Sequence, residues 1–338
     1  MALRPKQLTQ SEPTTPELSG PIDPAKTVGG QAVLEGVMMR APAAWSVAVR
    51  LPDDTITARR DELPRLSERK RAARIPLLRG ILVLWESLSL GFKALSWSAE
   101  RATGEEEKPL TGFQIGWTMA LAMLFFAGVF ILIPAFAAGF VSGDSGILFN
   151  VAEGLFRLSL FIGYIWLIGR SQEIGRVFEY HGAEHMSIHA FEAGEPFSID
   201  SVRRYPPEHP RCGTSFLLIV VLCSIIFFSF FGQPGWAFLI VSRLLGIPII
   251  AGIAYEVLRL SGTRTTGWVS KGLAAPGIWL QKLTTRVPDD SQIEVAISSL
   301  VVALNDDILE EVIERGNVPE SALAVRRTVF ESPAPTDG

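Results

Sequence analysis

Long apolar runs dominate the pattern of this chain. Four of them are long enough to cross a hydrocarbon core of roughly 30 Å at about 1.5 Å per residue. They cover residues 114–141, 147–169, 214–232 and 236–260. Short connectors join the first run to the second and the third to the fourth, which predicts two transmembrane hairpins. The alternative is a set of buried helices in a soluble protein.

A fifth apolar stretch, residues 75–99, differs from the others because it contains Arg79, Glu86 and Lys93. We interpret it as an interfacial or re-entrant helix at the cytoplasmic side of the membrane. The alternative is a fifth crossing, which would reverse the orientation of everything that follows it.

Two smaller elements flank the apolar region. Residues 46–51 and 55–58 alternate apolar and polar side chains around a Pro-Asp-Asp turn, which predicts a β-hairpin. Residues 293–309 repeat apolar side chains at helical spacing, which predicts a helix that caps the cytoplasmic part. The expected fold is an all-α membrane protein with about four transmembrane helices in two hairpins, plus a small cytoplasmic β-hairpin element.

These elements divide the chain into segments. The expected order is a disordered N-terminal tail (1–26), a cytoplasmic Gly-rich element and β-hairpin (27–74), an interfacial or re-entrant helix (75–113), transmembrane hairpin 1 (114–169), a cytoplasmic His/Cys loop (170–213), transmembrane hairpin 2 (214–260), a cytoplasmic amphipathic helical region (261–325) and a disordered tail (326–338).

Basic residues predict the orientation of the chain. Neither short connector contains Lys or Arg, whereas the loop of residues 170–213 is rich in arginine. Its arginines are Arg170, Arg176, Arg203, Arg204 and Arg211. Under the positive-inside rule this loop and both termini face the cytoplasm, and the short connectors face out. The expected location is the cell membrane, with several crossings.

Composition agrees with a membrane location and limits the partners. Hydrophobic residues make up 48% of the chain, and its mean hydropathy is +0.29. A net charge of −4 without a basic stripe argues against nucleic acid. The two cysteines, Cys212 and Cys223, do not form a disulfide framework. Membrane lipid is the expected partner, while protein partners and assembly into a homo-oligomer are left open.

All four histidines lie in the loop between the two predicted hairpins, together with Cys212. His181, Glu184 and His185 match the H-x-x-E-H pattern, in which two histidines bind zinc and the adjacent glutamate activates a water molecule. In a helix the two imidazoles lie one turn apart on the same face. His209 and Cys212 have the close spacing of a second pair of ligands.

These residues predict a zinc site with Glu184 as its general base. The expected ligands are His181, His185, His209 and Cys212. If all four bind, the site is closed; if three bind, a position for water stays open. The alternative without metal is that the histidines cap helices or pair with Glu179, Glu184 or Glu208, and that Cys212 is a small residue at the membrane edge.

Three charged residues fall inside the predicted hairpins. Glu153 and Arg157 are one helical turn apart on the second run, and Arg243 is expected at a similar depth on the fourth. Because an isolated charge in the membrane is costly, we expect these side chains to form one polar cluster.

Several motifs together resemble the YqhQ-like bacterial membrane proteins. They are GGQAVLEGVMMR (29–40), HGAEH (181–185), HPRCGTSF (209–216), YEVLR (255–259) and LQKLTTR (280–286). The resemblance covers roughly residues 28–304 and implies a multi-pass membrane protein with a bound metal, but no substrate. Met186 departs from the family pattern, in which Lys is expected after HGAEH.

Three classes of function remain in view. The first is a membrane zinc enzyme, a hydrolase acting on a membrane-associated substrate with Glu184 as base. The second is a scaffold or assembly factor in which the metal only holds the His/Cys loop in place. The third is a small-molecule transporter, for which charges within the membrane would be the main evidence.

The orientation can be tested with reporter fusions. Because the connectors lack basic residues, fusions after Asp144 and Pro234 should report an outside location, and a fusion after Asp200 should report the cytoplasm. A cytoplasmic signal after Asp144 would exclude this topology.

Overall fold

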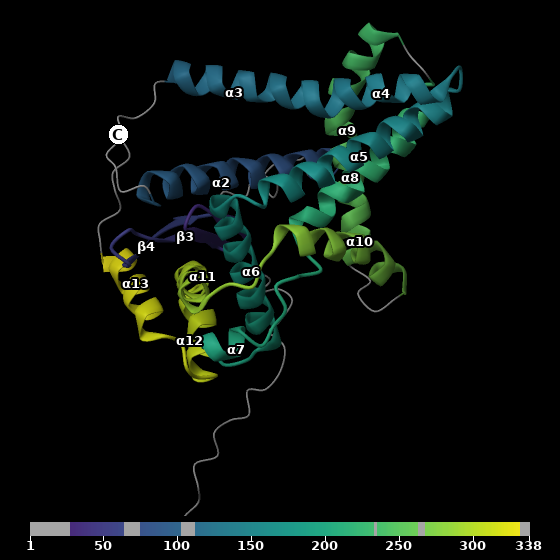
Figure 1. Cartoon of the computed structure of the whole chain (residues 1–338). Coiled ribbons are helices and arrows are strands. Elements are labelled where there is room, and N and C mark those ends of the chain that lie inside the picture. Colours follow the sequence, from purple (N-terminus) through teal and green to yellow (C-terminus); the bar gives the residue numbers. More distant parts are fainter. Residues whose placement is uncertain (1–27, 64–74, 103–111, 233–234, 263–267, 332–338) are drawn as a thin grey trace, which may run out of the picture.

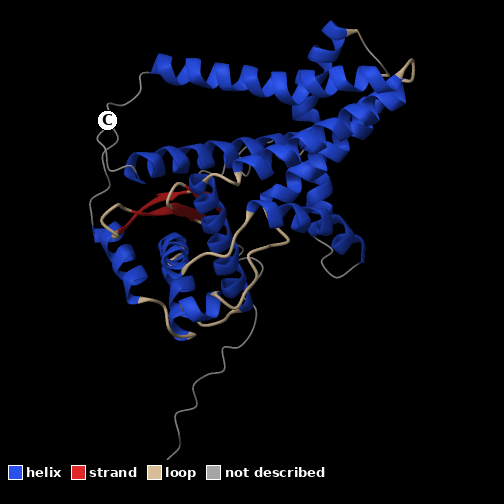
Figure 2. Ribbon diagram, viewed as in Figure 1, coloured by secondary structure: helices blue, strands red, loops and turns tan. Residues whose placement is uncertain are grey.

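The protein is mostly helical and contains one small β-sheet (Figure 2). The computed structural model describes residues 28–63, 75–102, 112–232, 235–262 and 268–331. The expected disordered tail at 1–26 lies outside the described residues. Figure 1 shows long helices grouped on one side of the molecule, and the sheet with shorter helices on the other.

The four apolar runs form helices, as expected, and follow one another in the expected order along the chain. They are α3 (Gly112–Ala127), η3 (Gly128–Leu132) and α4 (Ile133–Ser142) in continuous succession, then α5 (Gly146–Ile168), α8 (Gly213–Ser229) and α9 (Trp236–Gly262). Three described segments are long and apolar enough to cross a membrane: Gly116–Ser142, Gly146–Ile168 and Trp236–Leu258. Helix α8 is apolar but has only 17 residues, so its crossing stays a prediction.

The sheet is larger than the sequence pattern indicated. Its strands are β1 (Gly29–Val33), β2 (Gly36–Arg40), β3 (Ala44–Arg50) and β4 (Ile56–Glu62), all antiparallel in the order β1-β2-β3-β4. The predicted hairpin is β3–β4 and is confirmed. The Gly-rich element forms a second hairpin, β1–β2, so the all-α description of the fold was incomplete.

Both faces of the sheet are covered by helices, which explains its buried central strands. Val37 and Ala48 face a core shared with α6 (Gln172–Ala193) and α11 (Asp290–Ala303). Met38 and Val47 face the opposite way, onto α2 (Leu78–Ala102). This alternation follows the two-residue period of a strand. Figure 1 shows the sheet between α2 and α11.

Helix α2 corresponds to the predicted interfacial helix at 75–99. Near its start, Arg79 forms an ion pair with Glu256 of α9, and farther along it packs on the sheet. Its outer side exposes a row of apolar side chains: Trp85 is 67% exposed, Leu88 61% and Phe92 51%. An exposed apolar row of this kind suits an interface with lipid.

The C-terminal part consists of helices α10 (Trp268–Thr284), α11, α12 (Asp306–Glu314) and α13 (Glu320–Glu331). Helices α11 and α13 pack on the sheet, whereas α10 packs on α8 and α9. The predicted helix at 293–309 is divided, because the backbone of Leu304 is extended and Asn305 begins α12. Helix α11 is buried on nearly all sides rather than amphipathic. Helix α13 reaches Glu331, beyond residue 326, where we expected a disordered tail.

The predicted polar cluster between the apolar helices is confirmed. Arg243 of α9 donates to Glu153 of α5 from both Nε, at 3.1 Å, and Nη2. Arg157 also pairs with Glu153, and its Nε donates to the carbonyl oxygen of Phe130 in η3 at 2.9 Å. Shared pairing lowers the cost of placing charge among apolar helices.

Helix α6 is crossed by the segment between α10 and α11 at a point with no room for a side chain. A Cβ atom on Gly182 would lie 2.0 Å from the carbonyl oxygen of Arg286. The same segment is tied to α6 because the Arg286 N–H donates to the Phe178 carbonyl at 2.9 Å. The close approach therefore requires glycine at position 182.

Replacing Gly182 with alanine should destabilise the protein, because either α6 or a backbone segment must move. We expect a loss of about 1–3 kcal/mol or more, as for an overpacked core. Thermal unfolding in detergent measures this effect. Gly163→Ala is the matched control, since that helical glycine has no atom within 4 Å of the added Cβ. Equal melting temperatures for the two variants would contradict the packing described.

Candidate metal centre

Helix α6 and the segment before α8 provide the candidate ligands. Three residues separate the end of α5 from the start of α6, which carries His181, Glu184 and His185. It ends at Gly194, whose left-handed φ of 70° suits a glycine cap. Cys212 is the N-cap residue of α8, and His209 lies in the loop just before it. The site is therefore built where apolar helices meet the sheet-containing domain.

Backbone carbonyl groups orient both imidazoles of the H-x-x-E-H motif. The Nδ1 atom of His181 is 2.9 Å from the Thr284 carbonyl oxygen. The Nδ1 atom of His185 is 2.6 Å from the Pro207 carbonyl oxygen. Because a carbonyl only accepts, each Nδ1 carries the hydrogen, and each Nε2 presents a lone pair. This is the arrangement that outer-shell partners impose on histidine ligands of metals.

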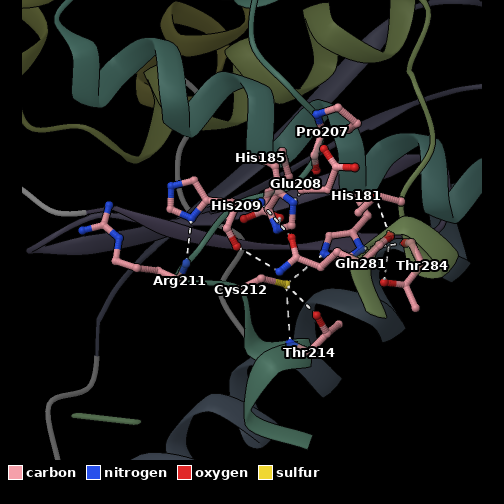
Figure 3. A network of polar contacts seen from close by, with 12 residues as sticks. His181, His185, Pro207, Glu208, His209, Arg211, Cys212, Thr214, Gln281 and Thr284 are labelled. Atoms are coloured by element: carbon pink, nitrogen blue, oxygen red, sulfur yellow. Dashed lines mark hydrogen bonds and ion pairs between the residues drawn. The ribbon is translucent and has the colours of Figure 1, made fainter. Parts of the chain in front are cut away.

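Cys212 completes a compact group with these two histidines. Its Sγ is 3.3 Å from Nε2 of His181 (Figure 3). The backbone N–H of Thr214 at 3.4 Å and its hydroxyl at 3.3 Å both donate to the same sulfur. Donors to sulfur at a helix N-terminus stabilise negative charge on it, which is the form that binds metal.

The spacing of the three residues fits a metal ion. One ligand atom from each of His181, His185 and Cys212 lies within 4.8 Å of the others. Zinc bonds of about 2.0–2.3 Å in tetrahedral geometry place ligand atoms roughly 3.5 Å apart. Two imidazole nitrogens and one thiolate suit zinc among the divalent ions. The donor set and its spacing therefore fit the expected cofactor.

Glu184 lies beside this group, held by the first strand of the sheet. Its Oε2 is 3.5 Å from Nε2 of His185, and the backbone of Gly30 lies against its carboxyl group. A Cβ on Gly30 would lie 2.6 Å from Cγ of Glu184 and 2.8 Å from the Met38 carbonyl oxygen. The Gly-rich element thus lines the site, and glycine at position 30 leaves the space that the carboxyl group occupies.

His209 lies next to the group but faces another partner. Its Nε2 is 3.5 Å from a carboxylate oxygen of Glu192, and its Nδ1 accepts from the Arg211 N–H at 3.2 Å. Its ring is 5.7 Å from that of His185 and 4.3 Å from that of His189, measured between centroids. The structure therefore brings together three of the four predicted ligands. Ligation by His209 stays a prediction.

Gln281 and Thr284 of α10 support the site, although we did not expect a role for either. The amide of Gln281 accepts from the His209 N–H at 2.7 Å and donates to the His209 carbonyl at 2.9 Å. Gln281 is completely buried. Both residues lie in the LQKLTTR motif of α10, which was a sequence signal without an assigned chemistry. Such contacts become visible only when α10 is placed against the loop.

Burial shifts the ionisation of every group at the centre toward its neutral form. It lowers the pKa of His185 to about 2 and raises that of Glu184 to about 8. The pKa of Cys212 rises to about 11, through burial and the nearby Glu184. A bound dication would reverse this preference for Glu184 and Cys212, because it stabilises their negative forms.

The apolar helices and the His/Cys group together define a membrane-associated protein with a candidate metal centre. The chain belongs to the family described as "Protein of unknown function (DUF1385)", whose model matches residues 75–306. It is 35% identical over 302 residues to "Uncharacterized protein YqhQ" of Bacillus subtilis (strain 168), covering 84% of this chain and 94% of that relative. No solved structure matches. The predicted family is confirmed. Neither the description of the family nor that of the relative assigns an activity.

Acidification should destabilise the metal-free protein through His185. Below a pH of about 6.5 the unfolded chain binds a proton on this imidazole. The folded protein does not bind it until about pH 2, so the free energy of unfolding falls as the pH drops. Melting temperatures of chelator-treated protein at pH 7.5 and 5.5 measure this fall, which His185→Gln should reduce.

Glu184 acts with the opposite sign, because its raised pKa makes stability fall as the pH rises from about 4.5 to about 8. The comparison is therefore best made in a Glu184→Gln background, where this contribution is absent. Identical pH dependence with and without His185 would contradict the assigned burial.

Proposed function

We propose that this protein is a zinc-dependent hydrolase of the cell membrane that acts on a membrane-associated substrate. The proposed ligands are His181, His185 and Cys212, with Glu184 as the general base. The observation that carries the proposal is the convergence of one ring nitrogen from each of His181 and His185 and the sulfur of Cys212 within 4.8 Å, with a buried carboxyl group beside them.

The chemistry follows from the division of roles among these side chains. When bound, zinc supplies a Lewis acid and lowers the pKa of a coordinated water molecule to about 7. Glu184 is placed to accept the proton of that water, because its carboxyl group lies 3.5 Å from a ligand nitrogen of His185. Three protein ligands leave one position open for water or substrate. The backbone of Gly30 packs against the carboxyl group and limits its movement.

The position of the site supports a substrate from the membrane. Cys212 is the N-cap of the apolar helix α8, and α6, which carries His181 and His185, follows the apolar helix α5 after three residues. With both termini and the His/Cys loop in the cytoplasm, the site lies at the cytoplasmic membrane edge. The exposed apolar side of α2 gives the same domain a surface for lipid.

A structural metal site in a membrane scaffold is the second candidate. The observation that favours it is burial: His185 is 2% exposed, Glu184 4% and Cys212 8%. A buried site restricts access to substrate, and closed zinc sites serve to hold segments together. Here the ion would fasten α6 to the start of α8. The two candidates differ in whether Glu184 has a chemical role.

Single substitutions should separate binding of metal from catalysis. We expect stoichiometric zinc in protein purified without chelator, and loss of that zinc in His185→Ala and Cys212→Ser, since each removes a ligand. Glu184→Gln should retain zinc but lose zinc-dependent cleavage of a p-nitrophenyl ester. Metal content by mass spectrometry and release of p-nitrophenol give the two readouts.

His189→Ala is the matched control, because this histidine lies on the same helix but bonds to the Glu208 carbonyl, outside the group of three. It should keep both zinc and activity. The zinc content of His209→Ala decides whether the ion has three or four protein ligands. Full activity in Glu184→Gln with zinc retained would favour the scaffold, and absence of zinc from the wild type would exclude both forms of the proposal.

A further inference from the structure

A second charged cluster lies far from the metal centre, among the apolar helices α5, α8 and α9. Glu153, Asn150 and Arg243 are each no more than 2% exposed. Figure 1 shows α5, α8 and α9 close together near the connector ends of α4 and α5, and α8 packs on both α5 and α9. Asn150 ties the cluster to the α8–α9 connector by donating to the Gly232 carbonyl at 2.6 Å.

The cluster has more positive than negative charge. Arg157 and Arg243 both pair with Glu153, so two guanidinium groups share one carboxylate. Residues 112–168 and 213–255 contain only one other charged residue, Asp144, which is exposed in the α4–α5 connector. Arginine does not lose its proton in proteins. The described cluster of Glu153, Arg157 and Arg243 therefore carries one net positive charge.

Arg243 also retains an unused hydrogen-bond donor. Its Nε and Nη2 bind Glu153 and Asn150, and its Cζ lies 3.8 Å from the centroid of the Phe228 ring. Its Nη1 is buried and has no hydrogen-bond partner among the described residues. A buried N–H without an acceptor is costly and calls for an explanation such as a bound ion.

A cavity of about 290 Å³ lies next to the cluster. Its lining comes from α4, α5 and α9 and consists of Ala135, Phe136, Gly139, Phe140, Phe149, Trp236 and Leu239. Phe149 precedes Glu153, and Leu239 precedes Arg243, by one helical turn on the same helix. The cavity therefore lies on the connector side of the charged cluster, about one helical turn from Glu153 and Arg243.

We propose that Arg243 and Arg157 form an intramembrane binding site for a single negative charge. The anion accepts a hydrogen bond from Nη1 of Arg243 and compensates the excess positive charge, and it enters through the cavity between α4, α5 and α9. A free monovalent anion and the phosphate of an anionic lipid share this chemistry. The site is independent of zinc and of the proposed hydrolase activity.

Thermal unfolding of the detergent-purified full chain tests this site. Replacing sodium gluconate with sodium bromide at constant ionic strength should raise the melting temperature in a saturable way, because an anion that binds only the folded protein stabilises it. If lipid phosphate is the natural source, short-chain phosphatidylglycerol should give the shift and bromide should not. In either case Arg243→Gln should lose the shift.

Two further variants keep the test decisive. Glu153→Gln leaves both arginines without their carboxylate, so its anion-dependent shift should be larger than that of the wild type; this holds even if Arg243→Gln does not fold. Arg326→Gln is the control, since Arg326 is a buried arginine of the sheet-containing domain that pairs with Asp306. It should lower the melting temperature and leave the anion-dependent shift unchanged.

Two results would overturn the proposal. The first is a wild-type protein that responds to neither bromide nor phosphatidylglycerol. The second is a shift of equal size in the wild type, Arg243→Gln and Glu153→Gln.

Discussion

The need to satisfy imidazole groups that are shielded from water organises the domain around α6. A shielded ring N–H without an acceptor is costly, and the buried His185 and the half-buried His181 and His189 lie one turn apart on one side of this helix. Three backbone carbonyl groups meet that need, those of Thr284, Pro207 and Glu208. None of the three belongs to α6. The loop before α8 and the end of α10 must therefore lie against α6 for the histidines to be shielded from water.

That requirement explains the glycines that lie close to α6 and the ion pair at its start. Gly182 allows the chain after α10 to cross the helix, and Gly30 allows β1 to approach Glu184. At the start of the helix, Glu35 in the β1–β2 turn pairs with Arg176. The backbone of Glu35 has a positive φ of 49°, which is strained for a residue with a side chain. The sheet thus acts as a platform that fixes α6 at two points.

The apolar helices and the site depend on each other. Helix α5 is followed by α6 after a short link, and Cys212 is the N-cap residue of α8. A change in the distance between α5 and α8 therefore changes the distance between His181 and Cys212. The buried ion pairs of Glu153 with Arg157 and Arg243 hold α5 against η3 and α9. These pairs fix the packing of α5, from which α6 and its two histidines continue after three residues.

The sequence alone determined the apolar segments, the β3–β4 hairpin and the set of residues at the site, because each depends on local periodicity, turn chemistry or residue type. It also indicated the pairing of Glu153 with Arg243, since charges among apolar helices need partners. Only the tertiary structure decided that three candidate ligands converge while His209 faces Glu192. It also revealed the β1–β2 hairpin, whose glycines carry no strand signal. The supporting carbonyl groups have no sequence signature at all, because every residue has one and its direction depends on packing between distant segments.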